Sequence, residues 1–524
     1  MAVGPTFGTG VFIGAGQALA IGGPASLLIS YIFLSLLTYF MATTAAEVAT
    51  YTPSQHGTLV TNVFRYMTPS MGVAAGFLRW YTLAMFVPYE ITTAMVNLGL
   101  WNPGATVAIR LSIITAIVLG FNYLPERFFR RSEQLFTKIK IGTTICLLVL
   151  SLSIGIGGAT GHDKWGFQYW TKPGAMHEYL VKGAMGKCLG LLQCLLTSSV
   201  AFTLAPEMIV HRAESPQAPS ESEVTENLNP DIQSGLPQQV AVDVATTVFP
   251  YILSSLAMGV MAPYDDPLLT NNGAGAGLSP FVIGLNTAKV HIVPVMATIS
   301  ILLSSVASGR SFLFLASHTL VAMSELGHGP KIFQARNKYG VRFVAVTASA
   351  LPALLAFISV AISSSTVANY FVLFITSSGF ASWLISGAVY VYYRRHIRLR
   401  GITSVYRFGI QPFGTYFGLA ASAALIMANG MTGALPDPRP GTKGGRLVAA
   451  YITFPMFAFV YLSHRFQDLI PYRTHEREEY LRESDPDHLT ARYPSRQDQE
   501  NRRGSSNNAS ALEMDQVWSL AVEA

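Results

Sequence analysis

Charged residues are scarce in this chain. They make up 12% of its 524 residues, about half the share of roughly 25% found in soluble globular domains. Cysteine is scarcer still, since the chain has only Cys146, Cys188 and Cys194, each in an apolar stretch. These positions exclude a disulfide framework and match no zinc motif. The sequence also lacks a glycine-rich phosphate-binding loop, which leaves ATP-driven transport without support.

Hydrophobic residues are abundant in this chain. Half of the residues are hydrophobic, and they gather in runs of about 20 residues, the length that crosses a ~30 Å hydrocarbon core. The alternating pattern of a membrane β-barrel is absent. The sequence therefore predicts an all-α, multi-pass protein of the lipid bilayer, built as a closed helical bundle. We expect the net charge of +6 to reflect loop topology, with no nucleic-acid partner.

Twelve transmembrane spans are predicted. Their approximate bounds are 2–22, 24–49, 71–100, 105–123, 136–158, 186–208, 240–262, 289–323, 342–363, 367–393, 412–433 and 446–464. Lys and Arg gather on the cytoplasmic side of multi-pass proteins. Sixteen of them border one set of alternate loops, from Arg65 to Arg407, and nine border the other set, from Arg110 to Arg446. This asymmetry predicts that the first set and both termini are cytoplasmic.

Two segments are too polar for a membrane. Residues 211–239 are rich in Pro, Ser and acidic side chains, which predicts a disordered cytoplasmic loop. Residues 471–524 are strongly charged, which predicts a disordered cytoplasmic tail. The remainder, 1–470, is expected to form one transmembrane domain.

Two of the spans contain residues that interrupt a helix. The first breaks at Gly8, Thr9 and Gly10, and the sixth breaks within SSVAFTLAPEM at 198–208. Unwound backbone at membrane depth survives only where it is buried in protein or lines a cavity, and it then offers N–H and C=O groups to a ligand. Paired breaks in corresponding spans of two five-helix halves favour a transporter site. Glycine also serves close helix packing, which remains an alternative for Gly-Thr-Gly alone.

Eight short motifs occur in order along the chain. They are GTGVFIGAGQALAIGGPASLLISY, RYMTPSMGVAAGF, VPYEI, YWTKPGAM, PYDDPLL, SPFVI, GPKIF and YITFPMFAFVYLSHR. Together they resemble the fungal amino-acid permeases of the amino acid–polyamine–organocation superfamily, over residues 4–473. The resemblance implies a LeuT-like fold of two inverted five-helix repeats followed by two further helices. It also implies proton-coupled import of amino acids across the plasma membrane, and no cofactor is expected.

A free amino acid carries a carboxylate and an ammonium group, and both must be held without water. The helix beyond Gly10 offers free N–H groups and the positive end of its dipole, which suit the carboxylate. Carbonyl groups freed by the break in the sixth span suit the ammonium group. These positions match the binding segments that the resemblance implies. The expected binding residues are Gly8, Thr9, Gly10, Phe202, Thr203, Leu204 and Ala205.

Three carboxylates are further candidates. Glu90 lies in the third span, where a carboxylate is costly unless it is paired or functional. The resemblance places a glutamate here, so Glu90 is either a substrate contact or a structural hydrogen-bonding group. Glu47, near the inner end of the second span, is expected to be a gate or a structural carboxylate. Glu207 follows the break in the sixth span, and we expect it to keep the carboxylate role of a family Gly-Thr-Glu motif in coupling or gating.

Two basic residues stand at or within apolar spans. Lys140 opens the fifth span and matches the family lysine that stands where sodium-coupled relatives bind a cation. A lysine removed from water can exchange its proton, as proton coupling requires, whereas a lysine at a span end can instead reach back to water. Arg310 lies midway along the eighth span, where the family usually has Asn. We expect it to pair with a carboxylate of the first, third or sixth span, or to favour acidic substrates.

The chain begins close to its first break. Residues 1–7 would span about 10 Å as a helix, against about 15 Å for half of the hydrocarbon core. We expect either a misassigned start codon or a leaky inner gate, and we favour the first. The main alternative to transport is a non-transporting amino-acid sensor of the same fold. An enzyme is disfavoured because the eleven histidines are scattered and form no catalytic constellation.

Overall fold

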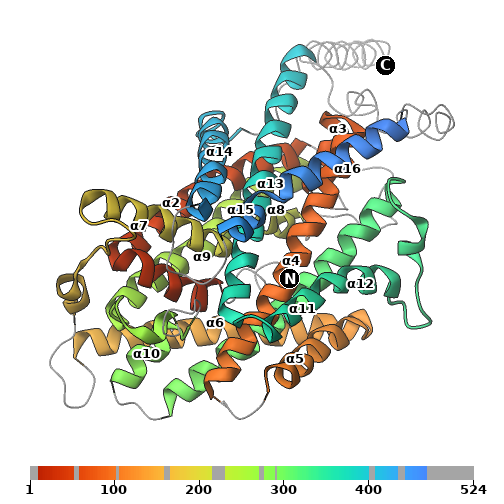
Figure 1. Cartoon of the computed structure of the whole chain (residues 1–524). Coiled ribbons are helices and arrows are strands. Elements are labelled where there is room, and N and C mark those ends of the chain that lie inside the picture. The colour runs from red at the N-terminus through yellow and green to blue at the C-terminus, as the bar shows by residue number, and fades with distance from the viewer. Residues whose placement is uncertain are drawn as a thin grey trace, which may run out of the picture.

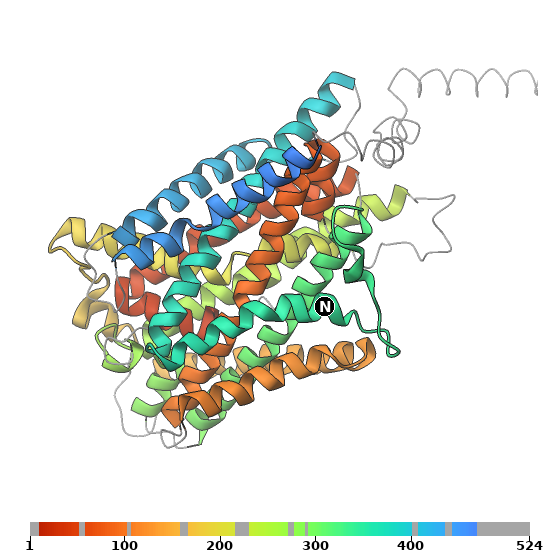
Figure 2. The same ribbon diagram turned by 45° about the vertical axis from the view of Figure 1, so that its right-hand side comes forward.

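Helices make up all the regular secondary structure of the described residues in the computed structural model, and the long helices lie alongside one another as a bundle (Figure 1, Figure 2). The structure describes residues 10–51, 58–101, 106–157, 166–214, 230–270, 277–288, 292–400, 407–434 and 443–468. The predicted all-α fold class is therefore confirmed.

The helices follow the chain in the order shown by colour in Figure 1. The α-helices are α2 (Ala15–Tyr51), α3 (Thr58–Tyr66), α4 (Pro69–Trp101), α5 (Val107–Asn122), α6 (Glu126–Ile156), α7 (Ala184–Ser198), α8 (Ala205–Glu214), α9 (Pro230–Met261), α10 (Pro280–Thr287), α11 (Val293–Glu325), α12 (Phe343–Ala350), α13 (Ser364–Arg400), α14 (Phe413–Ala434), α15 (Lys443–Tyr451) and α16 (Thr453–Asp468). The π and 3₁₀ segments are η1 (Gly10–Gly14), η2 (Trp170–Gly174), η3 (Ser199–Ala201), η4 (Pro267–Thr270), η5 (Lys331–Gln334) and η6 (Leu351–Val360).

Each predicted span overlaps a helix or a pair of helices. Within the described ranges, eight helices are long and apolar enough to cross a membrane, or nine if the bent pair α15 and α16 forms one span. The first two predicted spans share α2, and α5 is apolar but has 16 residues. The multi-pass membrane character is therefore confirmed, whereas the number twelve stays a prediction.

A turn at Gly23 divides α2 where the first two spans were expected to meet. Gly23 has φ 82° and ψ 172°, a conformation that side-chain-bearing residues rarely adopt. Space is short as well, because a Cβ atom here would lie 2.9 Å from the carbonyl oxygen of Ala175. The same carbonyl accepts a hydrogen bond from the N–H of Ala25 at 2.9 Å. Glycine therefore lets the backbone of 175–177 close over the turn.

Two apolar cores meet in the middle of the bundle. One is built mainly on α2, α7, α9 and α10, and the other on α4, α5, α11 and α13. Figure 1 shows α4 near the centre, with α13 and α11 beside it. The segment between α7 and α8 belongs to both cores, because Phe202 packs in the first whereas Val200 and Leu204 pack in the second. The interrupted helix is thus held at the junction of the two cores.

The polar segment 211–239 is helical at both of its ends, so the predicted loop is shorter than expected. α8 continues to Glu214, and α9 begins at Pro230. The reason is packing, since apolar side chains of α8 and α2 form one cluster with Leu236 and Val240 of α9. Residues 1–9, 215–229 and the expected tail at 471–524 lie outside the described residues.

Candidate transport site

The start of η1 lies against the interruption of the sixth predicted span. The sixth predicted span consists of α7, η3, a turn at 202–204 and α8, so this helix breaks where the sequence predicts. Pro206 stands in the first turn of α8, where its missing N–H costs no hydrogen bond. A Cβ atom on Gly10 would lie 3.1 Å from Cα of Ala201, so the start of η1 touches η3. Gly8 and Thr9 lie outside the described residues.

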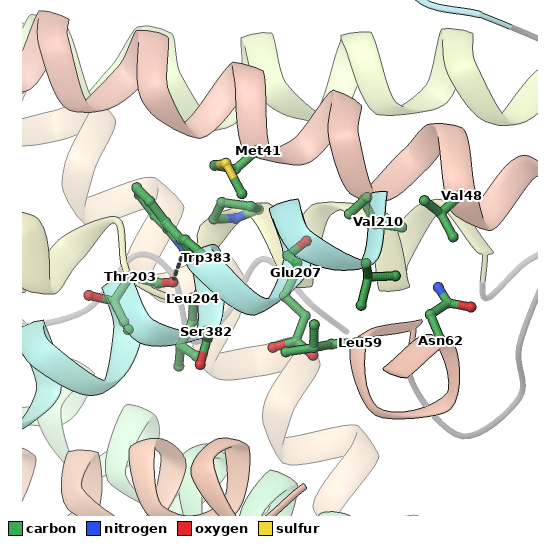
Figure 3. Close-up of a pocket in the computed structure, with 15 residues that line it drawn as sticks. Met41, Val48, Leu59, Asn62, Thr203, Leu204, Glu207, Val210, Ser382 and Trp383 are labelled. Atoms are coloured by element: carbon green, nitrogen blue, oxygen red, sulfur yellow. Dashed lines mark hydrogen bonds between the residues drawn. The ribbon is translucent and has the colours of Figure 1, made fainter. Parts of the chain in front are cut away.

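The carbonyl groups of the turn already have partners, which corrects the prediction that the break frees them. The carbonyls of Phe202 and Leu204 each accept a hydrogen bond of 3.0 Å from a backbone N–H farther along the chain. The carbonyl of Thr203 accepts one of 2.9 Å from the indole Nε1 of Trp383 on α13 (Figure 3). A carbonyl oxygen has two lone pairs, so each of the three keeps a second acceptor position.

Aromatic rings surround this turn. The ring of Phe202 packs edge-on against Tyr31 of α2 and Tyr251 of α9, with centroids 5.3 and 5.0 Å away. On α4, the hydroxyl of Tyr89 lies 3.5 Å from the position of a Cβ on Gly14. Edge-to-face pairs add about 0.5–1.5 kcal/mol each beyond the burial of their area, so they fix the turn. Sequence reasoning missed these tyrosines, although a hydroxyl-bearing ring inside an apolar span was the available signal.

A cavity opens beside the turn (Figure 3). Its walls come from α2, α3, α13 and residues 203–210, and its empty volume is about 630 Å³, open solvent included. Apolar side chains such as Met41 and Val48 line most of it, while Asn62, Glu207 and Ser382 supply polar groups. Apolar walls with a few convergent polar groups are typical of small-molecule sites.

Lys140 is buried in the bundle. The residue is 3% exposed, and its Nζ donates a hydrogen bond of 2.7 Å to the hydroxyl of Ser308 on α11. Glu133 and Glu90 are near enough to interact electrostatically with this ammonium group. Lys138, on the same helix α6, is exposed. The alternative that Lys140 reaches back to water is therefore wrong.

Glu90 belongs to the same group of buried charges. It is 2% exposed, and its Cβ lies 3.2 Å from where a Cβ on Gly309 of α11 would be. The preceding residue, Tyr89, is the one that faces η1 at Gly14. The structure thus brings Glu90 toward α11 and Lys140, and its direct contact with substrate stays a prediction.

Arg310 is buried among groups that offset its charge. It is 0% exposed, and its guanidinium donates hydrogen bonds of 2.5 Å to Glu133 and to Ser132, both on α6. Three aromatic rings lie 4.4 to 5.3 Å from its Cζ, and they belong to Phe121, Phe129 and Phe136. A carboxylate together with ring faces is what a buried guanidinium needs.

The predicted partner of Arg310 is therefore wrong. The carboxylate comes from Glu133 on α6 and from none of the first, third and sixth spans. Sequence reasoning missed Glu133 because the fifth span was predicted to start at 136, whereas α6 begins at Glu126. The charge of Arg310 is already neutralised inside the protein.

Glu207 and Glu47 each join two helices. Glu207 of α8 forms an ion pair with Arg79 of α4. Glu47 of α2 pairs with Arg394 of α13 at 3.3 Å and accepts a hydrogen bond of 3.0 Å from the hydroxyl of Tyr390. Arg79 was missed although it is, like Arg310, an arginine inside an apolar span. Contacts between helices suit gates, and the gating role of both carboxylates stays a prediction.

Comparison with known proteins identifies the family. The pattern of the family described as amino acid permease matches residues 1–468. The proline-specific permease of Emericella nidulans is 32% identical over 480 residues, which cover 90% of this chain and 84% of that protein. The proline-specific permease of Saccharomyces cerevisiae is 30% identical over 475 residues, which cover 89% of this chain and 73% of that protein.

A solved structure shares the fold. The manganese transporter of Eremococcus coleocola superposes with a TM-score of 0.54 at 15% identity, over 87% of this chain and 91% of that chain. The predicted LeuT-like transporter architecture is thereby confirmed. The relatives are permeases and transporters rather than enzymes. With η1 in contact with the interrupted sixth span of a membrane bundle, and a family pattern that matches from residue 1 to 468, the chain belongs to the amino acid permease family.

Proposed function

We propose that this chain imports amino acids across the fungal plasma membrane by proton symport, with both termini in the cytoplasm. The observation that supports coupling is the position of Lys140, buried at the contact of α6 with α11 and near Glu90 of α4. An ammonium group enclosed in this way can exchange its proton during a transport cycle. Because its charge acts on three helices at once, a change in its protonation biases how they pack.

The substrate that suits this site is a neutral amino acid, with proline as the first candidate. Two of the relatives described above are named as proline-specific permeases. Arg310 also argues against an acidic substrate, since Glu133 already neutralises its guanidinium. A second substrate carboxylate would have to displace that buried partner, which is costly.

The backbone at the two breaks would hold the amino acid itself. We assign the carboxylate to the N–H groups of Gly8, Thr9 and Gly10 and of the helix that follows them. We assign the ammonium group to the second acceptor positions of the carbonyls at 202–205. Glu90 would then influence substrate binding indirectly, through its electrostatic interaction with the ammonium group of Lys140.

The test is uptake of labelled proline and other amino acids in yeast that lacks its own general permeases, at about pH 5 and about pH 7. The unchanged chain is compared with Lys140→Met and with Lys138→Met, which alters an exposed lysine of the same helix. We expect saturable, acid-stimulated uptake that Lys140→Met loses and Lys138→Met keeps. Uptake that is equally acid-stimulated in Lys140→Met would refute the coupling role. Substrate-dependent signalling without any uptake at the cell surface would favour a sensor.

A further inference from the structure

An ion pair ties α8 to the body of the bundle. Arg79 lies in α4, within a stretch apolar enough to span a membrane, and is 8% exposed. Its guanidinium pairs with Glu207 of α8, and its Nε donates a hydrogen bond of 3.4 Å to the hydroxyl of Thr319 on α11. An arginine at this depth is costly unless its charge is matched. The matching carboxylate comes from the short helix that follows the break, so α8 is joined to α4.

This pair stands between two cavities. Glu207 lines the cavity of Figure 3 together with Thr203 and Leu204 of the turn. Arg79 lines a second cavity, which has more polar walls. Its other lining residues are Val60, His211, Leu315, His318, Thr319, Ala322, Glu325 and Arg342. Glu207 and His211 are one helical turn apart and share a face of α8. Since Glu207 lines one cavity and its partner Arg79 lines the other, the ion pair stands where the two cavities adjoin.

The helical ladder changes between α7 and α8. The two helices are joined by η3 and the turn at 202–204, where i→i+3 bonds such as that from the N–H of Ala205 to the carbonyl of Phe202 replace part of the α-helical pattern. Apolar packing holds α8 to α2 and α9. The contact with α4 is the Arg79–Glu207 ion pair, whose two charges are either in contact or separated and hydrated. A contact with two discrete states is what a switching element requires.

We propose that the Arg79–Glu207 ion pair acts as a lock, in the sense that it holds closed the cytoplasmic gate through which the substrate leaves. This inference rests on the proposed transport function and on its orientation, which places α8 on the cytoplasmic side. While the pair is closed, it holds α8 against α4 and separates the first cavity from the second. When the pair opens, α8 moves away from α4, and the two cavities join into one exit route beside Thr203.

The experiment measures how fast a reporter cysteine in the first cavity is modified. The reporter is Ser382→Cys, in a background in which Cys146, Cys188 and Cys194 are replaced by Ser. A membrane-impermeant maleimide is applied to inside-out and to right-side-out vesicles. The test variant is Arg79→Gln. The matched control is Arg342→Gln, because Arg342 lines the second cavity but pairs with Glu325 instead of α8, at 3.1 Å.

We expect Arg79→Gln to speed modification in inside-out vesicles by about tenfold, which corresponds to a shift of ~1.4 kcal/mol toward the open form. Arg342→Gln should leave the rate unchanged. The exchanged pair, Arg79→Glu with Glu207→Arg, should restore the slow rate, which a loss of packing alone would not explain. If Arg79→Gln does not reach the membrane, Glu207→Gln replaces it with the same expectation, since it removes the other half of the pair.

An unchanged labelling rate in Arg79→Gln, or in Glu207→Gln where it replaces that variant, would refute the proposed lock. An equal acceleration of labelling in Arg342→Gln would refute it as well. Acceleration seen only in right-side-out vesicles would support the lock and overturn the proposed orientation. The labelling reaction needs neither uptake nor a proton gradient. Failure of the Lys140 experiment and failure of this one are therefore distinguishable.

Discussion

Removing one partner of the buried Arg310–Glu133 pair is expected to harm the protein more than removing both. The side chains of this pair are 0% and 5% exposed. Removing one partner of such a pair costs about 3–5 kcal/mol, because the other charge stays buried without its counter-ion. Replacing both with uncharged groups of similar size is often nearly neutral. The two single variants are Arg310→Met and Glu133→Gln.

The groups next to Arg310 and Glu133 decide how much stability each variant is expected to lose. In Arg310→Met, Glu133 keeps the hydroxyl of Ser311 as a donor at 2.7 Å, so the cost should fall near ~3 kcal/mol. The double variant relieves the unpaired charge but still loses the aromatic ring contacts of the guanidinium, so it should cost about 1–2 kcal/mol. The expected order of stability is therefore unchanged protein, double variant, then either single variant.

The assay is unfolding of the purified protein in detergent, followed by tryptophan fluorescence, with the midpoint as the measure. Arg342→Met serves as the control, because Arg342 and Glu325 form a pair whose side chains are 21% and 32% exposed. Exposed pairs contribute about 1 kcal/mol or less, so this variant should move the midpoint little. A double variant less stable than both single variants would refute the reasoning, because the two losses would then simply add.

Three further predictions concern close approaches and the buried lysine. Gly379→Ala should abolish uptake, because its Cβ would come within 2.1 Å of Cγ2 of Thr203; Thr203→Ser removes that methyl group and should restore part of the uptake. Ser308→Ala removes the hydrogen-bond acceptor of Lys140 and should weaken acid stimulation of uptake more than uptake itself. Gly23→Ala should lower the unfolding midpoint, since its φ of 82° is strained for alanine and a carbonyl oxygen lies 2.9 Å from the new Cβ.

Local chemistry explains what the sequence predicted well. The break in the sixth span was predictable because Pro206 and the hydroxyl-bearing residues before it weaken a helix wherever it packs. The boundary between the first two predicted spans fell at Gly23, where the structure has a turn, although α2 continues through it. The family was recognisable because its motifs are contiguous stretches that need no knowledge of packing.

Pairings between distant helices explain what the sequence did not predict. Glu133 and Arg310 are 177 positions apart, and their contact depends on how α6 packs against α11. The same holds for Trp383, whose indole reaches the Thr203 carbonyl 180 positions away. The burial of Lys140 followed from the resemblance alone, because a lysine at the predicted edge of a span is as compatible with water as with the protein interior.

The indole of Trp383 occupies one of the two acceptor positions of a carbonyl in the candidate site. Its N–H already bonds the Thr203 carbonyl, one of the groups to which we assign the substrate ammonium. An arriving amino acid takes the second position, so its ammonium group shares an acceptor that already holds one donor, and the net gain is about 0.5–1.5 kcal/mol, far below the gross strength of one hydrogen bond. Loose binding of this kind favours rapid departure. A carrier that must release its substrate in every cycle is helped by such weak binding.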